Sequence, residues 1–488
     1  MADTDGRQMP YRLQVVDSDG TAAIHAATVE VLSRTGVVYE DAEALRILSA
    51  AGAVAEDDGL VKIPAGLLEK AIESAPTAIR MYSREGEEAM RLEQGYAYCG
   101  TGSDCLYVID SQTRERRLAT KTDIEIFTRL SDALPNIDFV LSMGLASDVP
   151  RATADLHHFQ AMVCNTSKPI FFTATYHQNL VDIIDLASEI AGRSRALEER
   201  PFLAHFAMPS PPLRHSRTAL QNLIHSARTS VPVVYATGTS MGGLGPMSIA
   251  GGTVSANCDI LSGLVVHQLA NPGAPFIYGI GVSVMDMFTT IDSYGAPEHH
   301  LADVVNAQVA HSYGLPTWGY AATTDSKVLD LQAALEYFSA TLMGLLSGCN
   351  LLHDVGYLES GMTASCESIV FGNELLEHAR RLLQRVDVSE EALAVETIKR
   401  AGPGGMFLDA PHTVAHLRDF WYSPLMDRRR YSQWMDKGGK TMFERLQTRV
   451  EELLSSHQPT PLDESIVLRI DDLIASRESI ATSEARRC

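Results

Sequence analysis

Residues 348–361, GCNLLHDVGYLESG, hold a short apolar run that ends abruptly in polar residues. Leu351 and Leu352 are followed at once by His353 and Asp354. A buried strand of a parallel sheet has this form, because it is apolar along its length and polar where it reaches a loop. The stretch therefore predicts a strand whose end carries an imidazole and a carboxylate.

Six further runs of the same kind precede it, and their starts lie roughly 30 to 45 residues apart, the length of one βα unit. They are FVLSMGLA (139–146), PIFFTAT (169–175), FLAHFAMP (202–209), VPVVYATG (231–238), APFIYGIG (274–281) and LPTWGYAATT (315–324). With an eighth strand in AYCGTG (97–102), the pattern favours a TIM (β/α)8 barrel of the α/β class. A doubly wound sheet is the alternative, but no GxGxxG follows its first strand.

The repeating pattern divides the chain into three predicted regions. Residues 1–136 form an α/β lead-in, in which helical segments end in glycine and short segments alternate like hairpin strands. Residues 137–385 form the barrel. Residues 386–488 form a C-terminal helical extension that packs on the outside of the barrel or contacts another subunit.

The composition excludes several classes of protein. The formal charge of −21 over 488 residues disfavours nucleic-acid binding, which needs a basic face. No stretch approaches 18 uninterrupted apolar residues and the N-terminus is polar, so a cytoplasmic protein without a membrane span is predicted. The seven scattered cysteines argue against disulfides and structural zinc. Cys366 is either a nucleophile or, more commonly for such a residue, a buried thiol.

The active site of such a barrel is expected at the C-terminal ends of the strands, where His353 lies. No metal is expected, because the neighbouring residues of the His157–His158 and His299–His300 pairs point about 100° apart on a helix. The glycine-rich segment 238–252 lacks the lysine of a phosphate-binding loop. Tyrosines and tryptophans near strand ends, in an acidic protein, suit a quaternary ammonium ligand, although an aromatic core looks the same in sequence.

Five ordered blocks carry a resemblance to the trimethylamine methyltransferase superfamily. They begin at GTSMGGLGPMSIAGG, YGAPEHHLADVV, TTDSKVLDLQAALEY, GCNLLHDVGYLESG and GPGGMFLDAPHTVAHLRDFW. The resemblance implies a TIM barrel that moves a methyl group from an amine to the Co(I) form of a corrinoid on a separate small protein. It also implies a homo-oligomer.

The founding members of that superfamily carry pyrrolysine in the barrel and use trimethylamine. This chain has only standard residues in the corresponding region, ATTDSKVLDLQ (322–332), so it resembles the branch without pyrrolysine, which uses quaternary amines such as glycine betaine. A quaternary nitrogen leaves as a neutral amine, and catalysis would be mainly positioning. Proline betaine, carnitine, choline and trimethylamine are alternative substrates, and a non-catalytic binder of quaternary amines is an alternative function.

The resemblance also suggests site residues. Asp104 and His353 are the expected polar pair, in which Asp104 offsets the ammonium charge and His353 orients the ligand or bonds its carboxylate. The expected aromatic cage consists of Tyr98, Tyr278, Trp318 and Tyr357. Glu359 and Glu367 are secondary candidates for the site, and a structural role at a helix N-terminus is the alternative for both. Gly243 and Gly245 are expected to shape the opening that the corrinoid protein covers.

Overall fold

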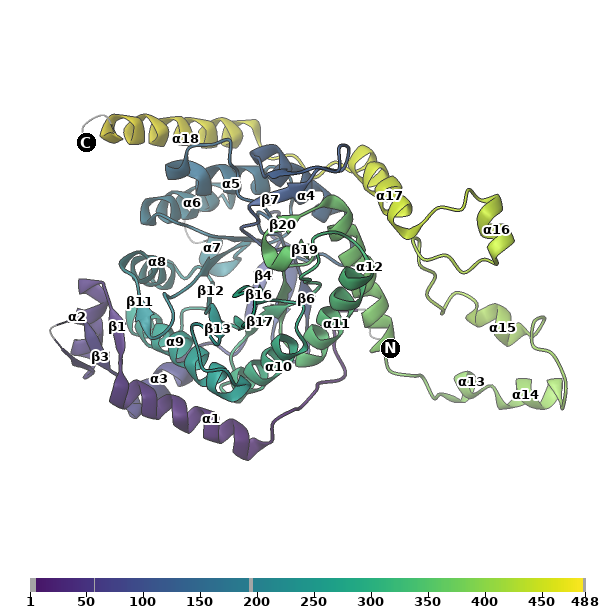
Figure 1. Ribbon diagram of the computed structural model, residues 1–488, viewed down its shortest axis with the longest axis horizontal. Helices are drawn as coiled ribbons and strands as arrows, with labels where there is room; N and C mark the ends of the chain where they lie inside the picture. Colours follow the sequence, from purple (N-terminus) through teal and green to yellow (C-terminus); the bar gives the residue numbers. More distant parts are fainter. Residues whose placement is uncertain (1–5, 57, 193–195, 486–488) are drawn as a thin grey trace.

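The computed structural model describes residues 6–56, 58–192 and 196–485, and its centre is a parallel β-barrel (Figure 1). Seven strands form one parallel sheet in the order β6-β18-β17-β14-β12-β10-β9. Their bounds are β6 (Tyr98–Cys99), β9 (Ile170–Phe172), β10 (Leu203–Ala207), β12 (Val233–Ala236), β14 (Phe276–Gly279), β17 (Thr317–Tyr320) and β18 (Leu351–His353).

Residues 139–140 supply the eighth position and close the barrel. Phe139 forms a parallel bridge with Gly100, directly after β6, and Val140 forms one with Ile170 of β9. The sheet therefore returns to its first strand, which an open doubly wound sheet does not do. The prediction of a TIM barrel is confirmed, including the strand placed at AYCGTG.

One long helix follows each of the eight strand positions, and together they ring the barrel (Figure 1). These helices are α4 (Lys121–Ala133), α5 (Ala154–Val163), α6 (His177–Ile190), α8 (Arg217–Arg228), α9 (Ile249–Ala270), α10 (Pro297–Ser312), α11 (Leu331–Ser347) and α12 (Cys366–Leu382). Their starts follow ordinary capping rules: Thr120 and Asp330, for example, accept backbone N–H groups of α4 and α11.

Alternate residues of the strands fill the barrel with large side chains. Trp318 lies at the centre, fully buried, with the rings of Phe139 and Phe171 at 5.4 and 5.1 Å between centroids. The hairpin β4 (Ile79–Tyr82) and β5 (Glu88–Leu92) adds its apolar residues to the same cluster and closes the N-terminal end. Because that end is plugged, a ligand site inside the barrel is expected at the C-terminal end.

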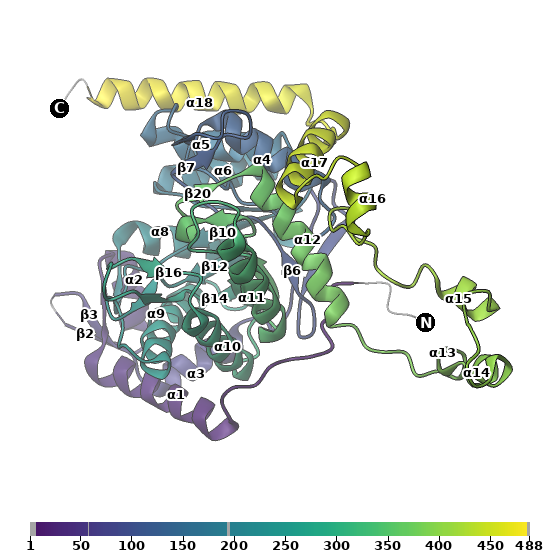
Figure 2. The same ribbon diagram turned by 45° about the vertical axis from the view of Figure 1, so that its right-hand side comes forward.

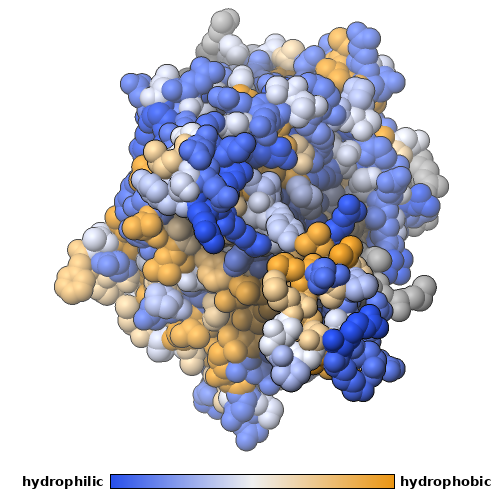
Figure 3. All heavy atoms as spheres, turned by 90° about the vertical axis from the view of Figure 1, so that its right-hand side faces the viewer, coloured by the Kyte–Doolittle hydropathy of each residue, from blue (hydrophilic) through white to orange (hydrophobic). Residues whose placement is uncertain are grey.

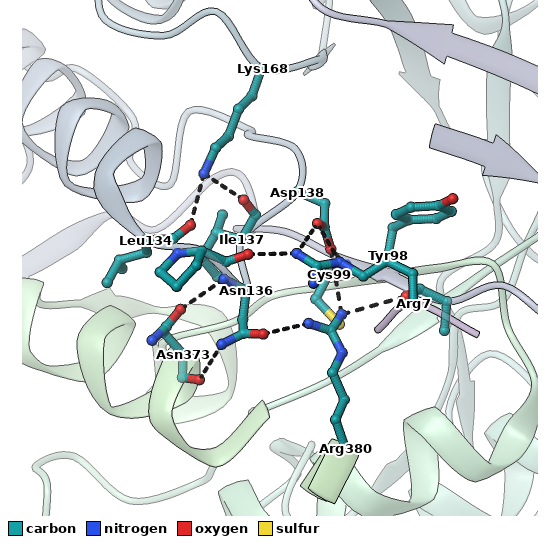
Figure 4. Close-up of polar contacts among 12 residues, drawn as sticks. Arg7, Tyr98, Cys99, Leu134, Asn136, Ile137, Asp138, Lys168, Asn373 and Arg380 are labelled. Atoms are coloured by element: carbon teal, nitrogen blue, oxygen red, sulfur yellow. Dashed lines mark hydrogen bonds and ion pairs between the residues drawn. The ribbon is translucent and has the colours of Figure 1, made fainter. Parts of the chain in front are cut away.

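A polar network fixes the closing segment at its N-terminal end (Figure 4). Asp138 accepts hydrogen bonds from Arg7 Nε and Nη2 at 2.8 and 2.6 Å, and Arg380 Nη2 lies 3.5 Å from its other oxygen. Lys168 Nζ donates to three backbone carbonyls, including that of Ile137 at 2.6 Å. The N-terminal segment, α12 and the closing segment are thus joined at one point.

The N-terminal region packs on the long helix α9. It contains α1 (Ser18–Glu30), η1 (Val31–Thr35), β1 (Val37–Tyr39), α2 (Ala42–Ala50), β2 (Val54–Ala55), β3 (Leu60–Lys62) and α3 (Ala65–Ser74). β11 (Arg214–His215) joins its small sheet. α9 is long and apolar enough to cross a membrane, but most of it is buried here among α1, α3, α8 and α10, as expected of a core helix.

The C-terminal region has two parts. α17 (Met442–Ser456) packs on α12 and α4, and α18 (Glu464–Ala485) lies along α5 and α6 (Figure 2). Between them and α12, residues 386–418 form an arm that projects from the body (Figures 1 and 2). It contains α13 (Glu390–Leu393), α14 (Val395–Ala401) and α15 (Pro411–His416), and α16 (Tyr431–Asp436) follows it.

The division at residues 136 and 385 remains a prediction. β6 and α4 precede residue 137 and yet belong to the barrel, so the barrel draws its first strand and helix from the region assigned to the lead-in.

Candidate functional site

The C-terminal mouth of the barrel is surrounded by short strands from the βα loops. One sheet has the order β19-β20-β7-β8, and another has the order β13-β15-β16. Their bounds are β7 (Tyr107–Ile109), β8 (Arg116–Leu118), β13 (Thr239–Met241), β15 (Val282–Met285), β16 (Asp292–Ser293), β19 (Tyr357–Leu358) and β20 (Thr363–Ala364). The loops after β6 and β18 are packed together inside this frame.

Two carboxylates, Asp104 and Asp354, follow β6 and β18 with unusual backbone conformations. Their φ angles are +73° and +69°, a region that few residues other than glycine adopt. A Cβ on Gly102 would lie 2.2 Å from Asp354 Oδ1 and 2.3 Å from Tyr357 Cζ, so glycine is required for this close approach. Such strained conformations cluster at functional sites.

His353 lies beside Asp354 and rests on the aromatic floor of the mouth. Its ring centroid is 4.5 Å from that of Trp318 and 4.6 Å from that of Tyr320. Nδ1 lies 2.7 Å from the carbonyl oxygen of Gly319, which can only accept, so Nδ1 carries the proton. Burial lowers the pKa of His353 to about 3, so the ring is neutral and its Nε2 presents a lone pair, 3.2 Å from Asp354 Oδ1.

α10 adds a second histidine and a third carboxylate to this group. His299 Nδ1 lies 2.9 Å from the carbonyl oxygen of Val282, and its ring packs on Tyr320 and stacks on Tyr294. Burial also lowers the pKa of His299 to about 3. Its Nε2 is 3.8 Å from the Asp303 carboxylate, and neither this nitrogen nor Asp303 Oδ1 has a hydrogen-bond partner.

The surroundings of the carboxylates at the mouth disfavour the ionised form. Burial, and then the charge of Asp104, raises the pKa of Asp354 well above its usual range. Burial and the charge of Asp354 do the same for Asp303. Asp104 is exposed to solvent, yet close protein atoms remove enough water to raise its pKa as well. In the described residues, no Lys or Arg forms an ion pair with Asp104, Asp303 or Asp354.

Of the eight side chains predicted for the site, three meet at the mouth: Asp104, His353 and Tyr357. Trp318 forms the floor beneath them and is fully buried. Tyr98 begins β6 and therefore lies at the plugged end, where its hydroxyl accepts a hydrogen bond from the backbone of Arg91. Tyr278 points out of the barrel, because its hydroxyl donates to Asn257 of α9. The structure does not bring Tyr98 or Tyr278 to the mouth.

The two predicted glutamates lie outside the group. Glu359 pairs with Arg116 at 2.7 Å and accepts from Thr363, in the sheet beside the mouth. Glu367 lies in the first turn of α12, where it accepts from Ser111 and lies 3.7 Å from Arg114. Cys366 is buried, and this burial raises its pKa to about 12, which favours an inert thiol over a nucleophile.

Gly243 and Gly245 lie in the loop between β13 and α9, at the edge of the mouth. Gly245 forms a bridge with Met241, and a Cβ on Gly243 would lie 2.6 Å from Met285 Cε. The loop therefore packs closely on β15. This position agrees with a role in shaping the opening, which remains a proposal.

The argument that neighbouring histidines cannot face one ion fails for His299 and His300. One ligand atom of each, with one of Asp303, lie within 4.8 Å of one another, because both rings turn toward the same space at the end of α10. The 3.8 Å between His299 Nε2 and Asp303 leaves the group more open than ligands that share one zinc ion.

Sequence reasoning missed Asp303, and it counted Tyr294 and Tyr320 among the aromatic residues near strand ends without assigning either to the site. Tyr320 could have been found, because it lies two residues after Trp318 and so points the same way, one layer nearer the mouth. Asp354 was placed at the strand end with His353 but was given no role. Asp303 lies inside a helix, and no local pattern marks a helical carboxylate that faces a barrel mouth.

Comparisons with known proteins identify a family for the chain. Residues 6–481 match the family described as trimethylamine methyltransferase (MTTB). Trimethylamine methyltransferase MttB of Desulfitobacterium hafniense (strain DSM 10664 / DCB-2) is 32% identical over 460 residues, 93% of this chain and 92% of the relative. Glycine betaine methyltransferase of D. hafniense (strain Y51) is 28% identical over 477 residues, 97% of this chain and 98% of the relative.

A solved structure supports the fold. The monomethylamine methyltransferase MtmB of Methanosarcina barkeri aligns with a TM-score of 0.52 at 12% sequence identity, covering 93% of this chain and 89% of that chain. At this identity the likeness shows the fold alone. The family match, which extends over nearly the whole chain, shows more: the chain belongs to the trimethylamine methyltransferase (MTTB) family and is a methyltransferase.

Proposed function

We propose that this protein moves a methyl group from a small methylammonium compound to the Co(I) corrinoid of a separate corrinoid protein. One observation carries the proposal: Asp104, Asp303 and Asp354 meet among aromatic rings, without an ion pair to Lys or Arg in the described residues. Like charges that lie close together and largely buried are costly unless a cation or a bound proton compensates them. Aromatic faces beside carboxylates suit a methylated ammonium group.

The chemistry needs no acid or metal from the barrel. The cobalt(I) nucleophile gives two electrons to the methyl carbon, the C–N bond breaks, and the bonding pair stays on nitrogen as a neutral amine. The charge on nitrogen therefore disappears as the methyl leaves. Asp104 and Asp354 would hold the cation, and the rings of Tyr320 and Tyr357 would fix its direction, so positioning supplies most of the rate enhancement.

Glycine betaine is the substrate that the sequence resemblance suggested, and a relative bears that name. Trimethylamine appears in the names of other relatives. Choline, carnitine and proline betaine share the same methylated nitrogen. A binding protein without catalysis would hold the same cations and would give no methylated cobalt.

We propose that the corrinoid protein docks on an apolar rim at the mouth. The rim consists of exposed residues from three successive βα loops and the first turns of α11: Leu244, Met247, Met287, Phe288, Ile291, Val328, Leu331 and Leu335. Phe288 is 99% exposed and Leu331 is 90% exposed, which is unusual for large apolar side chains. A partner that brings its corrinoid to the mouth must cover this rim.

We also propose a homo-oligomer, with the arm of residues 386–418 packed on a second copy. No described residue of the arm is buried, although it carries many large apolar side chains. Figure 3 shows the side of the molecule from which the arm projects. Hydrophobic residues gather over the middle and lower part of this face. A cytoplasmic location remains a prediction.

The test of this function uses purified protein, chemically reduced cobalamin and a panel of methylamines. Formation of methyl-Co(III) is followed by absorbance. We expect turnover with at least one quaternary amine, and a loss of about a hundredfold or more in Asp104→Ala and His353→Ala. Binding without methylation of cobalt would favour the non-catalytic alternative, and near-normal rates in both variants would place the site elsewhere.

Rim variants test the docking surface separately. Phe288→Ser with Leu331→Ser should slow methylation of the corrinoid protein but leave methylation of free cobalamin unchanged, because free cobalamin needs no protein surface. Val54→Ser with Leu468→Ser removes two exposed apolar residues outside the rim and should change neither rate. Equal slowing of both acceptors by the rim variant would contradict docking there.

A further inference from the structure

His299, His300 and Asp303 of α10 bring three metal-ligating side chains together beside the mouth. One ligand atom of each residue lies within 4.8 Å of the others. In the described residues, no other three side chains of His, Cys, Asp or Glu come together this closely. At most 4% of each residue is exposed. The group therefore has both the composition and the burial of a metal site.

The spacing of the three residues on the helix explains how neighbouring histidines can face one ion. Successive residues of a helix are turned by about 100°, so His299 and His300 diverge. Asp303 lies about 40° from His299 and about 60° from His300 around the helix axis, one turn further on. Its carboxylate therefore lies between the two rings and can reach an ion that both rings bind.

Each of the three side chains has a buried polar atom without a hydrogen-bond partner among the described residues. These atoms are Nε2 of His299, Nε2 of His300 and Oδ1 of Asp303. Buried polar atoms normally have a partner, and one shared ion would satisfy all three.

The one hydrogen bond of the His299 ring fits a metal ligand. Its Nδ1 lies 2.9 Å from the carbonyl oxygen of Val282, which can only accept, so Nδ1 donates and the lone pair of Nε2 is free. Histidines that bind metals are commonly oriented in this way by a carbonyl or carboxylate behind the ring.

The other pair of neighbouring histidines provides a contrast. His157 Nε2 lies 3.0 Å from a carboxylate oxygen of Glu478, and His158 Nε2 accepts a hydrogen bond from the backbone N–H of Ala146 at 3.1 Å. These nitrogen atoms already have protein partners. Two adjacent histidines on a helix are therefore not enough to form such a group.

The distances within the group require a modest adjustment to bind an ion. Zinc lies about 2.0–2.1 Å from nitrogen ligands, so two ligands at the tetrahedral angle are about 3.3 Å apart. His299 Nε2 and Asp303 Oδ2 are 3.8 Å apart and would close by about 0.5 Å. The ligand atom of His300 would close by at most about 1.5 Å, which rotation of the side chains can supply.

We infer that His299, His300 and Asp303 bind a divalent transition-metal ion of the zinc or iron(II) class. Two imidazoles and a carboxylate are the protein ligands of many such sites. Three protein ligands leave a coordination position open for water or for an oxygen atom of a bound molecule. The ion offsets the charge of Asp303 and leaves Asp104 and Asp354 for the methylated cation.

Metal binding by the wild-type protein is the first test. Protein without a histidine tag is treated with a chelator, dialysed and titrated with Co²⁺, whose visible absorption reports its coordination, and then with Zn²⁺ as a competitor. We expect one Co²⁺ per chain with a Kd below about 10 µM, and its displacement by Zn²⁺. Weaker binding than this would overturn the inference.

Three variants of α10 locate the ion. Asp303→Asn and His300→Gln each remove one ligand and should raise the Kd about a hundredfold or more. His311→Gln is the matched control, because His311 lies about 18 Å further along the same helix and its Nε2 lies 3.1 Å from the carbonyl oxygen of Gly348. It should bind Co²⁺ as the wild type does. Unchanged affinity in either ligand variant would overturn the site.

X-ray absorption at the zinc edge keeps the test decisive if a variant does not fold. The wild-type zinc protein should show two imidazole ligands and at least one oxygen ligand. Sulfur in the first coordination shell would place the ion on cysteines and overturn the inference. None of these measurements uses a methyl donor or a corrinoid, so their failure leaves the proposed methyl transfer standing, and failure of methyl transfer leaves the metal site standing.

Discussion

At the scale of single residues, Gly102 controls the distance between the two loops that carry the carboxylates. In Gly102→Ala the new Cβ would overlap Asp354 Oδ1 and the Tyr357 ring. Both atoms belong to side chains and not to the backbone, so the strain falls on the mouth and the fold should survive. We expect Gly102→Ala to lower kcat/KM by about a hundredfold while the melting temperature changes by only a few degrees.

Gly66→Ala is the matched control. Gly66 lies in α3, and a Cβ there meets no atom within 4 Å. Alanine favours helix more than glycine does, so this variant should keep full activity and match or exceed the wild type in stability. A loss of more than about 3 kcal/mol of stability in Gly102→Ala would mean that the loops support the fold and not the pocket alone.

Only some residues of the candidate site could be placed from the sequence alone. The run NLLHDVG was enough to place His353 and Asp354 at the mouth, because the end of a parallel strand is defined by the change from apolar to polar residues. It could not tell which side of a strand faces inward. Ile277 fills the barrel and its neighbour Tyr278 faces α9, and an all-apolar strand gives no alternation that would distinguish them.

At the scale of elements, the closing segment depends on Asp138. Its carboxylate accepts from Arg7 and from the backbone N–H of Cys99, and it lies beside the buried Arg380. Asp138→Asn would leave the Arg380 charge poorly compensated in the interior. We expect a loss of about 3 kcal/mol in the free energy of unfolding, measured with urea.

A surface pair provides the control for that variant. Glu396 and Lys399 are 2.6 Å apart in the arm, and both side chains are exposed. Glu396→Gln should change the free energy of unfolding by no more than about 0.5 kcal/mol. Equal effects of the two substitutions would show that the network in Figure 4 does not hold the barrel closed.

The elements themselves were largely predictable, with one instructive exception. Seven apolar runs were identified as strands, because nothing else in a soluble protein is apolar for so few residues and so regularly spaced. In FVLSMGLA, however, the pairing is limited to single bridges at Phe139, Val140 and Gly144. How many residues of a run will pair depends on the partner strands, which its own sequence does not contain.

At the scale of the whole molecule, the arm predicts an assembly. Residues 406–408 are Met, Phe and Leu, and all three are exposed. Changing all three to Ser should lower the molar mass measured by light scattering after size-exclusion chromatography, because the contact between copies loses its apolar centre. The barrel lies apart from the arm, so methylation of free cobalamin should continue.

A triple change of similar size elsewhere controls for general effects. Val54, Leu468 and Ile480 are also exposed apolar residues, and they lie outside the arm. Their replacement by Ser should leave the molar mass unaltered. A wild-type protein that elutes as a monomer at micromolar concentration would contradict the proposed contact.

The joint at Asp138 also bears on synthesis of the chain. Arg380 is translated 242 residues after Asp138. The contact between them therefore cannot form until residue 380 of 488 has left the ribosome. Until then the closing segment between β6 and β9 lacks its contact with Arg380, so the backbone groups on that side of both strands are more open to other nascent chains. We expect ribosome-bound chains that stop before α12 to recruit chaperones, and chains that include it to release them.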